Sequence, residues 1–193
     1  MTNFELAENC KKMANAKTVY MWGCYGQKLT KALISKKAAQ YPNRFSAARR
    51  EYLKMLAEEN GFYACDCAGL IKNCLWGGFG NRLTYRAKTD FGSESMKKAA
   101  EKSGKIATIP EIPGIGVYKK NHVGVYIGNG RVTECTLGSR GDGVVETALR
   151  SVAWTDWFYI PGISYSQNVA EKKKPLAKYA DAVRKFFKKA DIV

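Results

Sequence analysis

The stretch FYACDCAGLIKNCLWGG, residues 62–78, holds three of the chain's six cysteines and decides the fold class. Its apolar middle and its closing pair of glycines predict a short buried helix. Cys67 lies where the preceding loop becomes this helix, after Asp66 and before two small residues. A thiol there meets the positive end of the helix dipole and unpaired N–H groups, which favour the thiolate and can stabilise an oxyanion. We therefore interpret Cys67 as a candidate nucleophile.

The other five cysteines fit a packed interior better than a zinc site or a disulfide framework. Cys65 and Cys67 are separated by one residue, which is closer than the usual spacing of zinc ligands. Such near neighbours also rarely meet the geometry of a disulfide. The role of Cys65 stays open, because it lies outside the predicted helix. We expect the remaining four to be small buried hydrophobes: Cys10, Cys24, Cys74 and Cys135.

A nucleophilic cysteine needs a base, and the chain has one histidine, His122. It begins the strand-like run HVGVYIG, so its side chain is expected at a sheet edge that can face a helix N-terminus. The next run, RVTECT, pairs with it across the Asn129-Gly130 turn and carries Glu134. A carboxylate within a β-run needs a partner, and an imidazole would serve. Glu134 is therefore the candidate that orients His122.

The order of elements predicts an α+β domain. Helical spacing is found in residues 3–16, 28–60 and 93–103, and residues 18–27 are predicted to be extended. From residue 116 to 149, short β-branched or aromatic runs separated by glycine turns predict an antiparallel meander. Helices come first and strands follow, as in α+β folds.

Three segments together resemble the NlpC-type family of papain-like cell-wall cysteine peptidases, found in bacteria and their phages. DCAGL (Asp66–Leu70) is similar to the family's DCSGL nucleophile motif, and HVGVYIGNG (His122–Gly130) resembles its base-bearing hairpin. VYMWG (Val19–Gly23) resembles the PYxWG segment that precedes the nucleophile. The resemblance implies a papain-like fold, in which N-terminal helices and the nucleophile helix pack on the antiparallel meander.

The resemblance also implies roles for particular residues. Twelve residues after its base histidine, the family places a third polar residue, most often histidine, asparagine or glutamine, and here that position is Glu134. Tyr20 would lie beside Cys67 and help to hold the oxyanion. Trp22 and Asp66, from the same motifs, are assigned to oxyanion or substrate binding. No metal and no organic cofactor is expected.

The predicted organisation has two parts. Residues 1–165 are expected to form the papain-like catalytic domain, with residues 28–62 as a basic helical insertion over or beside the cleft, where the family is usually more compact. Residues 166–193 combine a lysine-rich linker with a cationic amphipathic helical tail. The tail is either a docked or solvated helix or a segment that touches membrane or wall.

The net charge of +15 predicts attraction to polyanions. Nucleic acid, acidic lipid and anionic wall polymers all qualify, and no known nucleic-acid motif is present, so a basic nucleic-acid-binding protein remains only an alternative. With the resemblance, the expected partners are peptidoglycan stem peptides, anionic cell-wall polymers and, through the tail, a membrane surface.

The resulting hypothesis is a peptidoglycan hydrolase that cleaves an amide bond in the stem peptide by a Cys67–His122–Glu134 thiol mechanism. The resemblance favours a D-glutamyl–diamino acid endopeptidase acting as a lysin. An N-acetylmuramoyl-L-alanine amidase and a thiol acyltransferase on the same fold are the alternatives. The first twenty residues lack the apolar run of a secretory signal. We therefore expect synthesis in the cytoplasm and access to the wall through lysis or a holin-like route.

Overall fold

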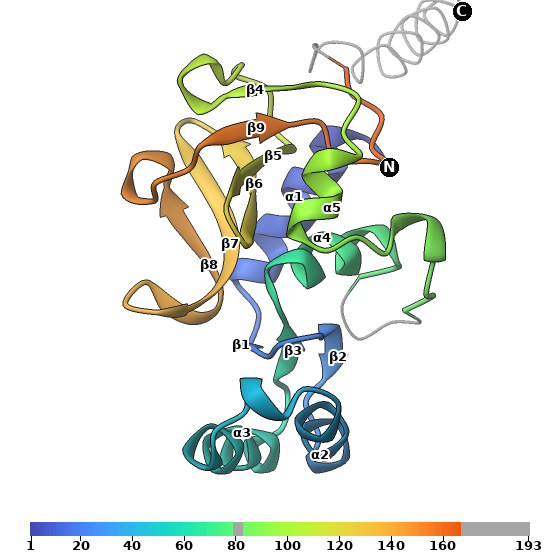
Figure 1. The fold of residues 1–193 in the computed structure, drawn as a ribbon, viewed down its shortest axis with the longest axis vertical. Coiled ribbons are helices and arrows are strands. Elements are labelled where there is room, and N and C mark those ends of the chain that lie inside the picture. The colour runs from blue at the N-terminus through green and yellow to red at the C-terminus, as the bar shows by residue number, and fades with distance from the viewer. Residues whose placement is uncertain (79–82, 167–193) are drawn as a thin grey trace, which may run out of the picture.

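The main body of the protein is a six-stranded antiparallel sheet with helices against one face (Figure 1). The structure is a computed structural model, and it describes residues 1–78 and 83–166. The strand order is β4-β9-β5-β6-β7-β8. The strands are β4 (Ser103–Lys105), β5 (Ile115–Lys119), β6 (His122–Gly128), β7 (Arg131–Gly138), β8 (Gly141–Ala148) and β9 (Asp156–Phe158). The predicted meander is confirmed as β5 to β8, and β9 and β4 extend the sheet beyond it.

The β6–β7 hairpin brings two of the predicted site residues to one face of the sheet. Its turn contains Asn129 and Gly130, whose positive φ angles of 53° and 65° suit the tight turn expected there. Gly124 on β6 pairs with Glu134 on β7. Because side chains alternate along a strand, His122 and Glu134 lie on the same face as diagonal neighbours.

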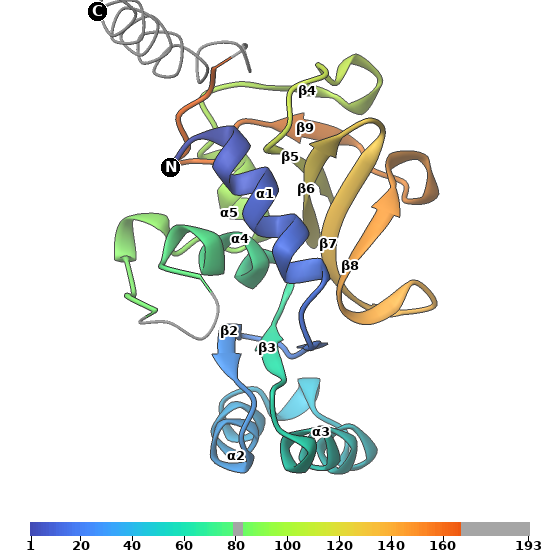
Figure 2. The ribbon, with the colours of Figure 1, turned by 180° about the vertical axis from the view of Figure 1, so that it is seen from behind.

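Helices α1 and α4 pack on one face of the sheet, with α5 beside them (Figure 2). The bounds are α1 (Asn3–Ala14), α4 (Cys67–Leu75) and α5 (Ser93–Lys98). The helix predicted for residues 3–16 is confirmed. The helix predicted for residues 93–103 ends earlier, because the chain turns into β4, which pairs with β9. The apolar core that these elements share includes Leu6, Cys10, Leu70, Ile71, Met96, Val123 and Val125.

A smaller lobe, below the main sheet in Figure 1, combines a three-stranded sheet with helices. Its elements are β1 (Thr18–Tyr20), β2 (Tyr25–Lys28), α2 (Lys31–Gln40), η1 (Pro42–Arg44), α3 (Ala47–Glu59) and β3 (Tyr63–Cys65). The central strand β3 pairs with β1 in parallel and with β2 antiparallel. The helical character predicted for residues 28–60 is confirmed by α2 and α3. The lobe has its own apolar core, which includes Val19, Leu29, Ile34, Phe45 and Leu53.

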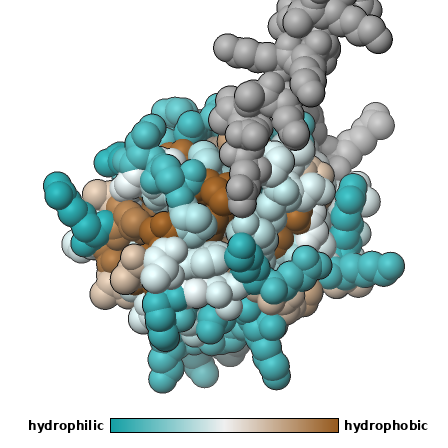
Figure 3. Space-filling view, turned by 90° about the horizontal axis from the view of Figure 1, so that it is seen from above, coloured by the Kyte–Doolittle hydropathy of each residue, from teal (hydrophilic) through white to brown (hydrophobic). Residues whose placement is uncertain are grey.

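The described ranges hold no helix that is both long and apolar enough to span a bilayer. Seen from above, hydrophilic residues project around the rim of the molecule, with hydrophobic residues visible between them (Figure 3). The predicted linker and tail, residues 166–193, lie outside the described residues apart from Ser166. The domain division at residue 165 and the role of the tail therefore stay predictions.

Candidate active site

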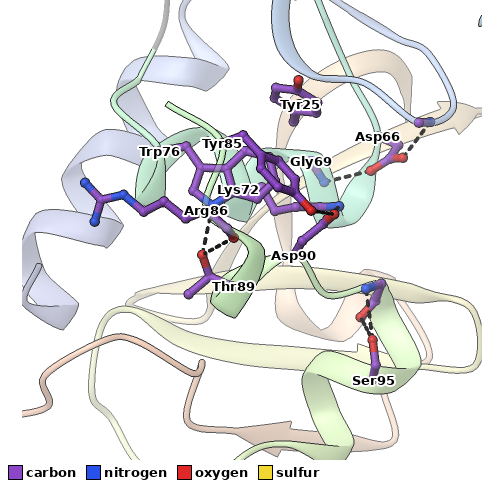
Figure 4. A network of polar contacts seen from close by, with 12 residues as sticks. Tyr25, Asp66, Gly69, Lys72, Trp76, Tyr85, Arg86, Thr89, Asp90 and Ser95 are labelled. Atoms are coloured by element: carbon purple, nitrogen blue, oxygen red, sulfur yellow. Dashed lines mark hydrogen bonds and ion pairs between the residues drawn. The ribbon is translucent and has the colours of Figure 1, made fainter. Parts of the chain in front are cut away.

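The candidate nucleophile, Cys67, is the first residue of α4, and Asp66 caps this helix. Asp66 Oδ1 accepts the N–H of Gly69 at 2.7 Å, and Oδ2 accepts the N–H of Gly23 at 2.8 Å (Figure 4). Position 69 tolerates no side chain, because a Cβ there would lie 1.9 Å from the carbonyl oxygen of Cys24. The carboxylate thus ties the start of α4 to the β1–β2 connection. The structure places Asp66 in this scaffold, and its part in substrate binding stays a prediction.

The Cys67 sulfur is nearly buried beside the start of β6. The residue is 6% exposed, and its sulfur accepts the backbone N–H of Val123. Burial and then the Asp66 carboxylate raise the pKa of the Cys67 thiol to about 12, although backbone N–H groups act to lower it. Removal of the sulfur from water thus outweighs the helix N-terminus and favours the thiol over the expected thiolate. The side chain therefore needs a base to become a nucleophile.

His122, at the start of β6, is in direct contact with Glu134. Its Nε2 lies 2.6 Å from Glu134 Oε2, and the Glu134 side chain is 0% exposed. Val123, whose N–H reaches the Cys67 sulfur, is the next residue along the strand. Because the carboxylate engages Nε2, Nδ1 is the ring nitrogen left to exchange a proton with the thiol. The structure therefore joins His122 to Glu134 and places Cys67 beside the same end of β6.

Trp154 holds the imidazole from a second direction. The rings of Trp154 and His122 are stacked, with centroids 5.3 Å apart and an interplanar angle of 9°. Gly124 leaves the space for this indole, because a Cβ there would lie 3.2 Å from Trp154. The stacking and the Glu134 hydrogen bond together restrict the orientation of the His122 ring. Sequence reasoning missed Trp154, which lies in the connection between β8 and β9 without a motif around it.

Glu134 has two further partners that sequence reasoning missed. Arg140 Nε donates to Oε1 at 3.1 Å and its Nη2 donates to Oε2 at 3.3 Å, while the Thr147 hydroxyl donates to Oε1 at 2.9 Å. Burial alone would raise the pKa of Glu134, but the hydrogen bonds from His122, Arg140 and Thr147 outweigh it and lower this pKa to about 2. Glu134 is thus a buried carboxylate, ionised at neutral pH and fully hydrogen-bonded.

A cavity of about 420 Å³ opens at His122. Its lining includes His122 from the main sheet and, from the smaller lobe, Tyr20, Trp22, Arg44, Phe45 and Arg49. Cys67 is not part of this lining, although Tyr20 packs against the apolar core that contains Cys67. A cysteine at a helix start, packed against a sheet that carries the histidine beside a cleft between two lobes, is the papain-like arrangement that the sequence predicts.

Arg49 links the smaller lobe to the main sheet beside the cavity. Arg49 on α3 contacts Asp142 at 2.5 Å and 2.8 Å, and it also donates to the carbonyl oxygen of Tyr20. Asp142 in turn accepts the N–H of Tyr20 at 3.0 Å. Arg44 lies 4.0 Å above the Trp22 ring, in cation–π contact. The segment between β2 and β3 therefore forms one wall of the cavity.

Burial also keeps the Tyr20 hydroxyl protonated. It raises the pKa of the Tyr20 phenol well above its usual value, and the charge of a Cys67 thiolate would raise it further. Tyr20 is consequently a hydrogen-bond donor at neutral pH.

A polar and aromatic network holds the segment from residue 84 to 92 against α4 (Figure 4). Lys72 of α4 pairs with Asp90 at 2.7 Å, and Asp90 also accepts the Tyr85 hydroxyl at 3.1 Å. The Trp76 indole donates to Thr89 at 2.8 Å and packs edge-on against Tyr85. None of these residues lines the His122 cavity, so the network supports the nucleophile helix from outside the site.

All six cysteines are free and buried. The burial predicted for Cys10, Cys24, Cys74 and Cys135 is confirmed, and Cys65 is 0% exposed as well. Among residues 1–78 and 83–166, no three histidine, cysteine or acidic side chains come together as a potential metal site.

Comparisons with known proteins give structural neighbours only. No family model matches the chain, and no curated protein matches it. The structure of NlpC2 from Trichomonas vaginalis is 16% identical, with a TM-score of 0.42 over 82% of this chain and 48% of that chain. The peptidoglycan hydrolase RipB from Mycobacterium tuberculosis is 22% identical, with a TM-score of 0.44 over 84% of this chain and 67% of that chain. The chain thus spans about half the length of the first and two thirds of the second.

Proposed function

We propose that the protein is a peptidoglycan hydrolase of the NlpC type, which cleaves an amide bond in the stem peptide with Cys67 as nucleophile and His122 as base. The observation that carries this proposal is the His122–Glu134 contact at 2.6 Å, beside the helix start that bears Cys67 and next to an open cavity. The motifs DCAGL and HVGVYIGNG support the choice of substrate, because they resemble those of cell-wall peptidases.

The first half of the reaction forms a thioester. The Cys67 sulfur attacks the amide carbonyl carbon while the thiol proton passes to His122. The tetrahedral intermediate then collapses, the carbon–nitrogen bond breaks, and His122 returns the proton to the leaving amine. Glu134 and Trp154 hold the imidazole in place for both transfers.

The second half of the reaction releases the product. His122 takes a proton from water, the resulting oxygen nucleophile attacks the thioester carbonyl, and the carbon–sulfur bond breaks. The sulfur leaves as thiolate and recovers the proton from His122, so the enzyme returns to its starting state. Neither half of the reaction includes an oxidation or a reduction.

The oxyanion of both intermediates is assigned to two donors, the backbone N–H of Cys67 and the hydroxyl of Tyr20. The raised pKa of Tyr20 supports this assignment, because the phenol keeps its proton at neutral pH. Asp66 fixes the helix start from which the Cys67 N–H points. Trp22, which lines the same cavity, is assigned to substrate contact.

The bond proposed for cleavage lies between D-glutamate and the diamino acid of the stem peptide, and the proposed biological role is that of a lysin. Arginine and lysine side chains on the cavity wall, namely Arg44, Arg49 and Lys119, suit a substrate that carries carboxylates. The overall charge of +15 favours accumulation on anionic wall polymers, an attraction that salt weakens.

The test is digestion of purified cell walls followed by mass spectrometry of the released muropeptides. We expect the wild type to produce fragments with a new amine on the diamino acid, and Cys67→Ala to produce none. Cys74→Ala, on the same helix and outside the cavity, is the matched control and should keep the product pattern. Equal digestion by Cys67→Ala would contradict the proposed function. Cleavage at the muramoyl–L-alanine bond would instead identify an amidase, and transfer of the acyl group to another molecule would identify an acyltransferase.

A further inference from the structure

The charge on Glu134 presents a chemical problem for the reaction proposed above. The carboxylate is 0% exposed and lies 2.6 Å from His122 Nε2. An unbalanced carboxylate at that distance favours the charged imidazolium over the neutral ring. His122 must take up a proton and release it in each half of the reaction, so a strong preference for the charged form would slow its action as a base.

Arg140 supplies the balancing charge from the turn between β7 and β8. It contacts both carboxylate oxygens of Glu134 and also donates from Nη2 to the Thr136 hydroxyl at 3.3 Å. This third contact holds the guanidinium in place beside the carboxylate. The Arg140 side chain is 30% exposed and lines the cavity, so its charge is partly shielded from solvent.

Other charged or titratable groups line the cavity at His122 or lie next to its lining. They are Cys67 from α4, Tyr20 from β1, Lys119 from β5, Arg44 and Arg49 from the smaller lobe, and Asp142 from β8. Lys119 is the cross-strand partner of His122, and Arg49 is paired with Asp142. Among the described residues, Glu134 is the one carboxylate in hydrogen-bond contact with the imidazole.

We propose that Arg140 is a positioning residue which, by pairing with Glu134, makes this carboxylate act on His122 as a neutral orienting group. The Glu134–Arg140 pair has no net charge, and it still accepts the Nε2–H hydrogen bond that fixes the tautomer and orientation of the ring. The pair therefore fills the place where the sequence resemblance implies a neutral histidine, asparagine or glutamine. The charge balance follows from the geometry alone, and its catalytic consequence rests on the proposed hydrolase function.

The direct test is an NMR titration of His122 in the full chain, which has one histidine and hence one imidazole signal to follow. In Arg140→Gln, the midpoint of the titration should rise by about one pH unit, because Glu134 is left unbalanced. In Glu134→Gln it should fall by about the same amount, because Arg140 keeps its charge. The double variant, which restores neutrality, should return the midpoint to the wild-type value.

Two further variants separate charge balance from folding. Arg140→Lys keeps the charge and should hold the midpoint near that of the wild type. Arg131→Gln, on β7 and paired with the exposed Glu146 at 3.6 Å, removes a cation of the same sheet away from the cavity and should leave the midpoint unchanged. If Arg140→Gln does not fold, the comparison of Glu134→Gln with the double variant decides the question.

Hydrolysis supplies a second readout. The acid limb of the kcat/KM profile of Arg140→Gln should move to higher pH by about one unit, with KM unchanged at the pH optimum. A midpoint that shifts by less than about 0.3 unit in Arg140→Gln, or a double variant no closer to wild type than the single ones, would overturn the proposal. The NMR arm needs no turnover, so a wild type that fails to digest walls would count against the proposed function alone.

Discussion

The two walls of the candidate site are built in different ways. On the hairpin side, Glu134 binds a histidine twelve residues before it and an arginine six residues after it. On the lobe side, Arg49 of α3 reaches Asp142, which lies 93 residues further along the chain. In the hairpin wall, the residues that position the proton-transferring imidazole are therefore close together in sequence. The position of the lobe wall depends instead on an ion pair between residues far apart in sequence. Substitutions in the first should alter kcat, and those in the second should alter substrate binding.

The largest expected effect comes from the hairpin wall. His122→Ala should lower kcat by about a thousandfold or more, because the chain has no other histidine to accept the Cys67 proton. The measurement is the rate of release of free amino groups from cell walls, with Arg131→Gln as the control on the same sheet. A loss below tenfold would show that the base lies elsewhere.

Tyr20 lies where the two walls meet, since its backbone is hydrogen-bonded to Arg49 and to Asp142. Tyr20→Phe keeps the ring and removes the hydroxyl, so kcat should fall about a hundredfold while KM changes little. Steady-state kinetics on a soluble stem-peptide fragment provides both constants. A rise in KM alone would assign Tyr20 to substrate binding.

Glu134 should also stabilise the fold in a pH-dependent way. Its folded pKa of about 2 is below its ordinary value of 4.5, so the stabilisation is present above about pH 4.5 and is lost as pH falls towards 2. Glu134→Gln should therefore lower the free energy of unfolding by about 2 kcal/mol at pH 7. Urea unfolding at several pH values measures this difference, which should shrink on acidification. A constant difference across that range would show that the ionised carboxylate is not the stabilising group.

The smallest expected effect comes from the lobe wall. Arg49→Ala breaks the pair with Asp142 and should raise KM about threefold to tenfold with kcat nearly unchanged, since the wall loosens while His122 stays in place. Lys54→Ala is the matched control on α3, because its pair with Glu51 is exposed and far less costly to lose. A fall in kcat with KM unchanged would contradict the assignment of substrate binding to the lobe wall and of catalysis to the hairpin wall.

The same contrast explains how much the sequence could predict. The β6–β7 hairpin and the helix of Cys67 follow from local signals, a tight turn and a capped apolar run, and both are confirmed. Strands β4 and β9 have three residues each, which is too short for a recognisable alternation. The parallel pairing of β1 with β3 joins segments separated by two helices, so no local pattern reveals it.

Within the site, the sequence predicted the partners that follow from strand register and missed those that depend on three-dimensional packing. The alternation of side chains across the hairpin was enough to pair His122 with Glu134. Arg140 and Trp154 lie in connections, where residue spacing does not determine which way a side chain points. The thiol state of Cys67 was missed because it depends on burial, which a helix-start argument does not measure.

The central claim is that the Cys67 thiol gives its proton to His122, and the rate of alkylation by iodoacetamide at different pH values tests it most directly. All six cysteines are buried, and peptide mapping separates labelling at Cys67 from labelling at the other five. The raised pKa of about 12 means that, without help, the reactive thiolate accumulates only in alkaline solution. We predict that at pH 7 Cys67 of the wild type is labelled at least about tenfold faster than in His122→Ala, and that the two rates converge at high pH. Equal labelling rates at Cys67 in the two proteins across the whole pH range would contradict the account.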